Sequence, residues 1–572
     1  MKRYILFLPF IGIFSGLSAQ QSNSLQREVV IEKEFTPIVQ DASKINTIPE
    51  MEVSAPTRPD IKYAEWSSPY KSAPALTRLD AGDSGAEAPD KQHGYARFSI
   101  GNYLNIVGNA GIRIVNTAKD QLLLWYGHNS TNGNLSYIET REKIRQKRYD
   151  NKVNLKYAHL FQKGVWDFAA NYRYNNFNYY GLPLAIDKND YDRVRGITDR
   201  QIAQQYGFST AFRTVGKHPF NYTVNAGYQA HNNYLGLYYG DLGGIENHIT
   251  AGFDGYGLIN DDYKAGLALT LDNLVYNRCD RKNYAIVGIE PYFAIEKKSI
   301  LFKAGAKIDL SFRDNTIFRI APDVKFEWTF GKAGLLYAHL TGGKSINSWY
   351  RMSNITSYID PSNVPANTYT PADLSVGFRS SVLKKVHFAL YGGIKSCVDA
   401  PFDYRMQHSD ITETSFWLTR NVVSFYAADA YAWKAGAEIE YEFRDFLTAR
   451  LAWDHNEWHR SGSRERIAFS EPRDEWTVEI TATPVKPLDI KAGFYFAGGL
   501  GYENLVTGNI EYPRAEGSLP NIADLHVGAT YRLNKMIHFS AQVNNILARR
   551  YEIFYGMPSQ RFHFLVGMGV VF

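Results

Sequence analysis

The sequence predicts an all-β fold, namely a transmembrane antiparallel up-and-down β-barrel of about 22 strands. Three observations predict it: strict alternation in the last strand, a repeating rhythm of strands, turns and loops, and the composition. The 572-residue chain contains 40 Tyr, and 15% of its residues are aromatic. This aromatic excess is typical of the aromatic girdles that barrels carry at both membrane interfaces.

The last twelve residues, 561–572, alternate between two kinds of side chain. Because successive side chains of a strand point to opposite faces, one face is large and apolar and the other is small or polar. The apolar face contains Phe562, Phe564, Val566, Met568, Val570 and Phe572. The segment is long enough to cross a bilayer as a tilted strand. Unpaired strand edges are not stable in lipid, so the preceding chain must complete a closed barrel.

The N-terminus has the features of a secretory signal. Lys2 and Arg3 supply positive charge, residues 4–14 are apolar, and small or turn-forming residues lead to Ala19. We predict a signal peptide over residues 1–19, a proline-rich periplasmic segment over 20–92 and an outer-membrane barrel over 93–572. A formal charge of only +5 argues against nucleic acid as a partner.

Seven prolines between residues 20 and 92 disfavour regular structure there. One interpretation is an extended periplasmic leader. The other is a docking peptide that adds to the sheet edge of a partner or lies in the barrel mouth. The residues proposed for docking are Val29, Val30, Ile31 and Phe35.

From Tyr95 onward, the chain repeats segments of about ten residues in which apolar and polar side chains alternate. These segments are connected alternately by a tight turn and by a longer loop. Ten tight turns with both termini in the periplasm imply 22 strands, within a range of 20 to 24. The predicted turns are 116–120, 162–164, 216–219, 260–262, 296–299, 331–333, 383–385, 444–445, 484–487 and 534–535. The predicted extracellular loops are 129–150, 176–200, 231–247, 344–373, 398–427, 455–474 and 498–521.

Charged residues alternate with apolar ones in several predicted strands, as expected for a strand between lipid and a wet lumen. Lys434, Glu438, Glu440 and Glu442, for example, share one face of a predicted strand. Two prolines interrupt neighbouring strands at positions 291 and 322. Because proline cannot donate a ladder hydrogen bond, we predict bulges or rim positions at both.

The segment Val543-Asn544-Asn545-Ile546-Leu547-Ala548-Arg549-Arg550-Tyr551-Glu552, followed by the strand ending at Phe572, resembles the C-terminal signature of TonB-dependent outer-membrane receptors. The overall sequence pattern of the chain is similar to that of barrel proteins from Bacteroidota. The resemblance implies a large barrel and nutrient transport. Glu28-Val29-Val30-Ile31 resembles a TonB box. The family also carries an N-terminal plug of more than a hundred residues, whereas here only about 73 precede the barrel.

A large barrel without a complete plug needs another closing element, which is the leader, inward-folded loops or a partner. Two functions follow. The first, favoured by the incomplete plug, is the membrane subunit of an outer-membrane protein assembly with a periplasmic or surface partner. The alternative is a TonB-dependent-type transporter or receptor for nutrient uptake. No catalytic arrangement or cofactor motif stands out, and an enzyme is not predicted.

Aromatic residues in the predicted outer loops are candidates for ligand binding or for the interfacial girdle. The candidates are Tyr179, Tyr180, Tyr234, Tyr238, Trp349 and Trp417. The basic run 141–148 is predicted in an outer loop, where it contacts lipopolysaccharide or a partner or is simply solvated.

The two cysteines, Cys279 and Cys397, fall in or near predicted outer loops and either form a disulfide or remain free thiols. His455 and His459 flank a misplaced Glu457, so the zinc pattern is not met and no metal site is predicted. The acidic run 187–192 also departs from a calcium loop and is interpreted as a turn.

Overall fold

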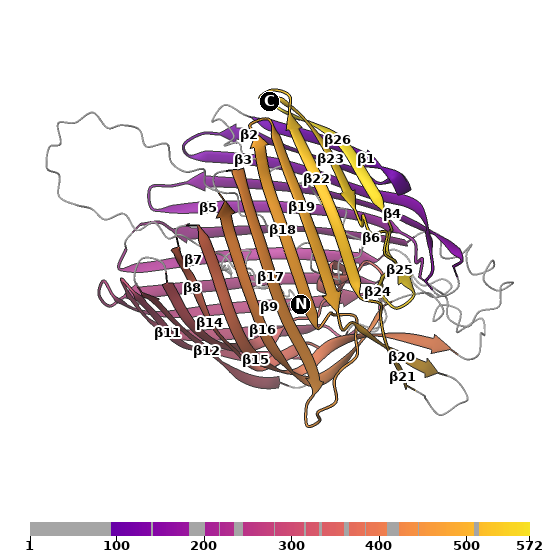
Figure 1. The fold of residues 1–572 in the computed structure, drawn as a ribbon. Helices are drawn as coiled ribbons and strands as arrows, with labels where there is room; N and C mark the ends of the chain where they lie inside the picture. The colour runs from indigo at the N-terminus through magenta and orange to yellow at the C-terminus, as the bar shows by residue number, and fades with distance from the viewer. Residues whose placement is uncertain are drawn as a thin grey trace, which may run out of the picture.

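A computed structural model describes residues 93–138, 141–181, 201–216, 218–233, 244–279, 281–313, 316–330, 334–359, 365–383, 385–408, 423–443, 446–507 and 514–572. The docking residues predicted at 29–35 and the acidic run 187–192 lie outside these ranges. Within them the chain forms a closed antiparallel barrel of 22 strands (Figure 1).

The ring runs in sequence order. Its first eleven strands are β1 (Gly94–Gly101), β2 (Ile106–Asn116), β3 (Asp120–Ser136), β4 (Lys143–Leu160), β5 (Gly164–Phe177), β6 (Gln201–Thr214), β7 (Phe220–Asn233), β8 (Ile245–Leu258), β9 (Tyr263–Asn277), β10 (Tyr284–Lys297) and β11 (Ile300–Phe312). The others are β12 (Thr316–Phe330), β13 (Gly334–Ser345), β14 (Thr368–Leu383), β15 (Val386–His408), β16 (Ser424–Phe443), β17 (Leu447–Arg460), β18 (Asp474–Val485), β19 (Leu488–Gly498), β22 (Ile522–Arg532), β23 (Ile537–Asn544) and β26 (His563–Val571).

The last strand closes the ring. β26 pairs antiparallel with β23 on one side and with β1 on the other, from Tyr95 opposite Val571 to Gly101 opposite Leu565. The carbonyl of Phe572 accepts hydrogen bonds from the backbone N–H groups of His93 and Gly94 at 2.6 and 2.8 Å. The sheet therefore leaves no free edge at the seam.

All ten predicted tight turns fall between consecutive strands of the ring, and the predicted number of strands is confirmed. At the end of the barrel opposite these turns, the strands extend further than the sequence indicated. β3 and β4 continue to Ser136 and from Lys143, so most of the predicted loop 129–150 is strand. The basic run 141–148 is likewise mainly strand, and its Gln146 and Arg148 are buried, which corrects its placement in a solvated loop.

The apolar face predicted for the last strand points outward. Phe564, Val566 and Met568 are exposed on the barrel exterior, whereas His563 and Leu565 are buried. The same alternation in β16 exposes Trp433, as expected for a lipid-facing surface.

Neither strand proline forms a bulge, and Pro291 lies inside β10 and not at its rim, so the prediction of a bulge or rim position is wrong for Pro291. The β10–β11 ladder has no pairs at Glu290 and Pro291 and resumes in the same register at Tyr292. Pro291 in β10 lies opposite Leu267 of β9 without a register shift, and Pro322 in β12 lies opposite Ala306 of β11 in an unbroken ladder. On its other side Pro322 falls just where the β12–β13 ladder ends, at Asp323 opposite Thr341. The missing donor therefore needs no rearrangement of that strand.

Four short strands stand outside the ring. β20 (Gly501–Thr507) and β21 (Arg514–Ser518) form a hairpin that pairs in parallel with the projecting end of β15. β24 (Glu552–Phe554) and β25 (Met557–Pro558) form a small hairpin between β23 and β26. The described helices are η3 (Asn102–Leu104) and α2 (Trp349–Ile355). No helix among the described residues is long and apolar enough to span a membrane.

Candidate functional site at the long-loop end

Two connections fold inward at the end of the barrel opposite the ten short turns, which we call the long-loop end. The α2 loop, residues 346–367, joins β13 to β14 and is described except at 360–364. The C-terminal loop, residues 545–562, joins β23 to β26 and carries the β24–β25 hairpin. Figure 1 shows β24 and β25 close to this end of the ring.

Both loops contribute to one buried apolar cluster, which we call the mouth cluster. Its members are Leu135, Tyr137, Ile144, Phe177, Tyr180, Ala203, Met352, Tyr358, Ile359, Val423, Phe425, Phe554 and Met557. At its centre the ring of Tyr358 packs edge-on against Phe177 and Tyr180, with centroids 5.5 and 5.1 Å apart. Edge-on aromatic pairs of this kind add specific geometry to simple burial.

The mouth cluster spans the lumen. Phe177 belongs to β5 and Phe425 to β16, and these strands are eleven places apart in the 22-strand ring, on opposite sides of the barrel. A backbone hydrogen bond also connects the α2 loop to the residues before β16, because the N–H of Val423 donates to the carbonyl of Tyr358 at 2.7 Å. Inward-folded loops, one of the closing elements that the sequence left open, therefore bridge the mouth.

A buried carboxylate fixes the start of α2 to the barrel wall. Glu246 of β8 accepts the backbone N–H groups of Trp349 and Tyr350 at 2.7 and 3.1 Å. Ser348 caps the same helix by accepting from the N–H of Arg351 at 3.1 Å. These acceptors satisfy donors that a helix N-terminus leaves free.

Close packing completes this attachment. The indole of Trp349 packs edge-on against Tyr276 at 5.6 Å. A Cβ built at Gly244 would lie 2.0 Å from that indole, so only glycine admits the ring. Burial lowers the pKa of Arg351 to about 10, and the guanidinium therefore stays charged at neutral pH. It donates to the carbonyl of Ile346 and to Asn347 within the loop.

The C-terminal loop is attached through polar contacts. Gln560 donates to Thr131 of β3 at 2.8 Å and accepts from Asn105 at 2.8 Å, all three being buried. Asn545, at φ 44°, exchanges side-chain hydrogen bonds with the backbone N–H and carbonyl of Arg549 at 2.9 and 2.8 Å. The residues that carried the family resemblance thus shape the turn that directs this loop inward.

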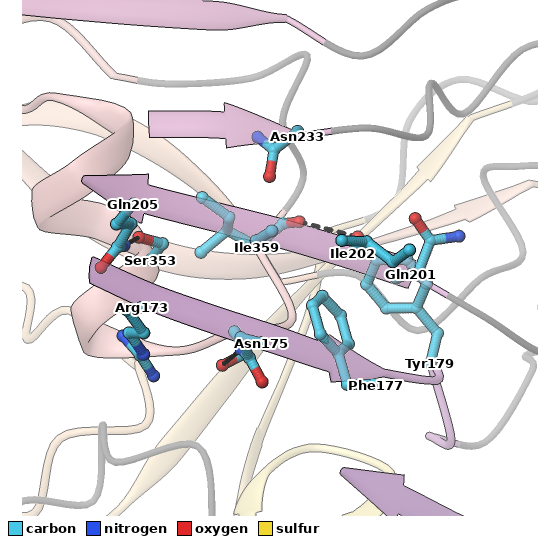
Figure 2. Close-up of a pocket in the computed structure, with 12 residues that line it drawn as sticks. Arg173, Asn175, Phe177, Tyr179, Gln201, Ile202, Gln205, Asn233, Ser353 and Ile359 are labelled. Carbon is cyan, nitrogen blue, oxygen red and sulfur yellow. Dashed lines mark hydrogen bonds between the residues drawn. The ribbon is translucent and has the colours of Figure 1, made fainter. Parts of the chain in front are cut away.

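A cleft lies between the wall and the α2 loop (Figure 2). Its lining combines Arg173 and Tyr179 with six uncharged polar side chains and several apolar ones. The uncharged polar residues are Asn175 of β5, Gln201 and Gln205 of β6, Asn233 of β7, and Ser353 and Ser357 of the α2 loop.

The polar groups of the cleft also hold the loop in place. Gln205 donates to Ser353 at 2.8 Å, and Asn175 donates to Ser357 at 2.8 Å. Arg173 donates to Asn354 at 2.9 Å and pairs with Asp150 at 2.7 Å. The hydroxyl of Tyr179 donates to the carbonyl of Ile359 at 3.1 Å.

Charged side chains of neighbouring strands pair along the interior wall, as the alternating pattern predicted. Arg450 of β17 contacts Glu438 of β16 and Glu479 of β18 at 2.8 and 3.2 Å. Lys434 of β16 also reaches across β15 and pairs with Asp373 of β14 at 2.7 Å.

The predicted aromatic site residues do not form one site. Tyr179 lines the cleft, whereas Tyr180 and Trp349 are buried among apolar residues and serve as packing anchors. Tyr234, Tyr238 and Trp417 lie outside the described residues. Sequence reasoning missed Asn175, Gln205, Asn233 and Glu246. The sequence signal that could have identified these residues is that they occupy lumen-facing positions near the ends of their strands.

The two cysteines are not joined in a disulfide. Cys397 is buried beside Phe402 and Ala430, whereas Cys279 packs near Trp349 in another cluster. No group of three or more metal-ligating side chains occurs in the described ranges. His455 and His459 are strand residues of β17, and His455 contacts Asp474 at 2.7 Å.

Comparison with known proteins identifies the fold. No protein-family model matches the chain, and no curated protein matches it in sequence. The FrpB iron transporter from Neisseria meningitidis superposes with a TM-score of 0.62 at 9% identity, covering 85% of this chain and 82% of that one. The ferripyoverdine receptor of Pseudomonas aeruginosa gives 0.57 at 11%, covering 84% and 72%. The copper transporter OprC gives 0.59 at 11%, covering 84% and 80%.

Proposed function

We propose, from the barrel fold that this chain shares with TonB-dependent outer-membrane receptors, that it is an outer-membrane transport barrel whose α2 loop is the gate. The observation that carries the proposal is the mouth cluster, which bridges opposite walls of a barrel lined with charged and polar groups. A barrel of this width without a closing element would be an open pore.

The proposed orientation places the long-loop end outside the cell and the short turns, with the segment 20–92, in the periplasm. The solute would enter at the long-loop end. The assembly-subunit interpretation, which the sequence favoured, gains no support from the comparisons, because the matched structures are named as transporters and receptors.

Single-channel conductance in a planar bilayer tests the gate. A short Gly-Ser linker can replace residues 346–367, because Ser345 and Thr368 are already paired neighbours in β13 and β14. We expect the intact protein to conduct little and the shortened variant to open a wide pore. The matched control shortens residues 508–513, between β20 and β21 outside the ring, and should remain closed.

Two outcomes would overturn the proposal. Equal, large conductance of the intact and shortened proteins would show an ungated pore. A shortened variant that is folded by heat-modifiable gel mobility but remains closed would show that the α2 loop is not the gate.

A further inference from the structure

We infer that the exterior of β4 at the long-loop end binds the phosphorylated headgroup of a lipid in the outer leaflet. The binding residues are Lys143, Arg145 and Lys147, which we call the basic stripe. The inference rests on the proposed function only in its orientation, which places the long-loop end at the outer surface of the membrane.

The alternation of β4 places the basic stripe on the exterior of the barrel. Gln146, Arg148 and Asp150 are buried, and Ile144 belongs to the mouth cluster inside the lumen. Because successive side chains of a strand point to opposite faces, the odd-numbered residues of this segment face outward. Of these outward residues, Lys143, Arg145 and Tyr149 are exposed and Lys147 is half-buried.

Exposed tyrosines indicate where this outer face crosses the membrane boundary. Tyr126 of β3 and Tyr172 of β5 both lie opposite Val153 of β4. Both tyrosines are exposed, as is Tyr149 nearer the basic stripe, and such positions are typical of an interfacial girdle. At about 3.3 Å per residue, the basic stripe begins about 7 Å beyond Tyr149 along the strand and ends about 20 Å beyond it. The basic stripe therefore lies at the level of the lipid headgroups.

The two outermost charges of the basic stripe are not neutralised by described residues. Neither Lys143 nor Arg145 forms an ion pair with a carboxylate in the part of the chain that the structure describes. Arg145 donates to the uncharged side chain of Asn132 at 2.7 Å. On the inner face, by contrast, Arg148 pairs with Asp150 at 3.2 Å. The residues of β3 opposite the basic stripe are also uncharged, namely Asn132, Asn134 and Ser136.

Positive charge at this level selects an anionic lipid headgroup. Each Lys or Arg close to an anionic membrane surface strengthens binding by about fivefold. Ammonium and guanidinium groups form strong charge-assisted hydrogen bonds with phosphate oxygens. The location favours a lipid over an acidic protein as the source of the phosphate, because the basic stripe continues the outward row of β4 that includes the exposed Tyr149.

Hydrogen bonds on both sides hold the basic stripe in a fixed geometry. The β3–β4 ladder continues as far as Lys143, which lies opposite Ser136. On the other side, Asn178 accepts from the N–H of Lys147 at 2.7 Å and donates to the carbonyl of Arg145 at 2.8 Å. The three basic residues therefore follow each other at intervals of about 7 Å along a paired strand. Binding to such a strand orders less of the chain than binding to a solvated loop.

Thermophoresis of the detergent-purified full chain, titrated with deep-rough lipopolysaccharide, tests the binding. We expect the double variant Lys143→Gln/Arg145→Gln to bind this phosphorylated lipid about tenfold more weakly, because two of the three charges are lost. The same lipid after dephosphorylation should bind the intact protein and the double variant equally. The variant Lys143→Arg/Arg145→Lys, which keeps both charges, should retain most of the affinity.

The matched control is Lys119→Gln/Lys163→Gln, which removes two exposed charges from the short turns at the other ends of β3, β4 and β5. It should leave the affinity unchanged, and heat-modifiable gel mobility shows whether every variant is folded. An unchanged affinity of the Lys143→Gln/Arg145→Gln variant, or equal weakening in the control, would overturn the inference. Displacement of the lipid by an equimolar polyglutamate peptide would overturn it in favour of an acidic protein. The gating proposal is judged separately, because conductance of the loop-shortened variant does not depend on Lys143 or Arg145.

Discussion

At the scale of single residues, Glu246 is the strand residue that holds the first turn of α2. Both of its carboxylate oxygens accept backbone N–H groups from the first turn of α2, and the side chain is buried in the barrel wall. A negative charge at this position also interacts favourably with the helix dipole. One strand residue thus determines where the loop begins its path across the mouth.

Substitution Glu246→Gln should loosen this attachment, because the amide lacks the charge and offers one acceptor in place of two. We expect a local loss of about 1 kcal/mol, the usual cost of a weakened helix cap. Hydrogen exchange at the amides of Trp349 and Tyr350 should be about five times faster. Exposed Glu516→Gln on β21 serves as the control, and unchanged exchange in Glu246→Gln would contradict the assignment.

Asn545 combines a left-handed backbone with several side-chain hydrogen bonds. Asn545→Gly keeps the backbone conformation but removes those bonds, at about 1 kcal/mol each. The gel-mobility transition on heating should therefore occur at a lower temperature. Asn134→Gly on β3 is a comparison outside this loop, and equal transitions in both variants would show that the Asn545 contacts contribute nothing.

At the scale of elements, each strand separates lipid from lumen by alternation. Ile480, near the middle of β18, is exposed on the outer face, whereas the neighbouring Glu479 contacts Arg450 inside. The register therefore determines which substitutions the barrel tolerates.

Ile480→Lys should destabilise the barrel by about 2–4 kcal/mol if the middle of β18 lies near the centre of the bilayer, because it places a charge on the lipid-facing surface. Thr477→Lys on the lumen side of the same strand should cost far less. Denaturant unfolding of both variants in lipid vesicles measures the difference. Equal losses would mean that the assigned faces of β18 are wrong.

The ring itself was predictable from the sequence, because alternation and turn chemistry are local signals. The ten tight turns and the outward face of Phe564, Val566 and Met568 follow from them directly. The site was not predictable in this way. Asn175, Gln205 and Asn233 lie on three consecutive strands, but they line a cleft only because the α2 loop, which is distant in sequence, folds over them. Tyr180 and Trp349 were candidates for ligand binding or for the interfacial girdle, and both are buried where the α2 loop meets the wall.

At the scale of the whole molecule, the mouth is bridged by residues of the barrel itself. We therefore expect deletion of residues 20–92 to leave the conductance in a planar bilayer low, because strand and loop residues within the described ranges are enough to bridge the mouth. The double variant that also lacks residues 346–367 should conduct strongly. A large current after the 20–92 deletion alone would assign the closure to the leader.

The mouth cluster also has a mechanical consequence. Apart from the residues that cross its lumen, a ring of 22 strands is held by contacts between strands around its circumference, so its cross-section can flatten under lateral pressure from the membrane. Contacts between Phe177 on one wall, Tyr358 in the middle and Phe425 on the other act as a cross-brace along one diameter. Undocking the α2 loop would therefore free the barrel to become more elliptical, and opening of the mouth would be linked to a change in the shape of the whole wall.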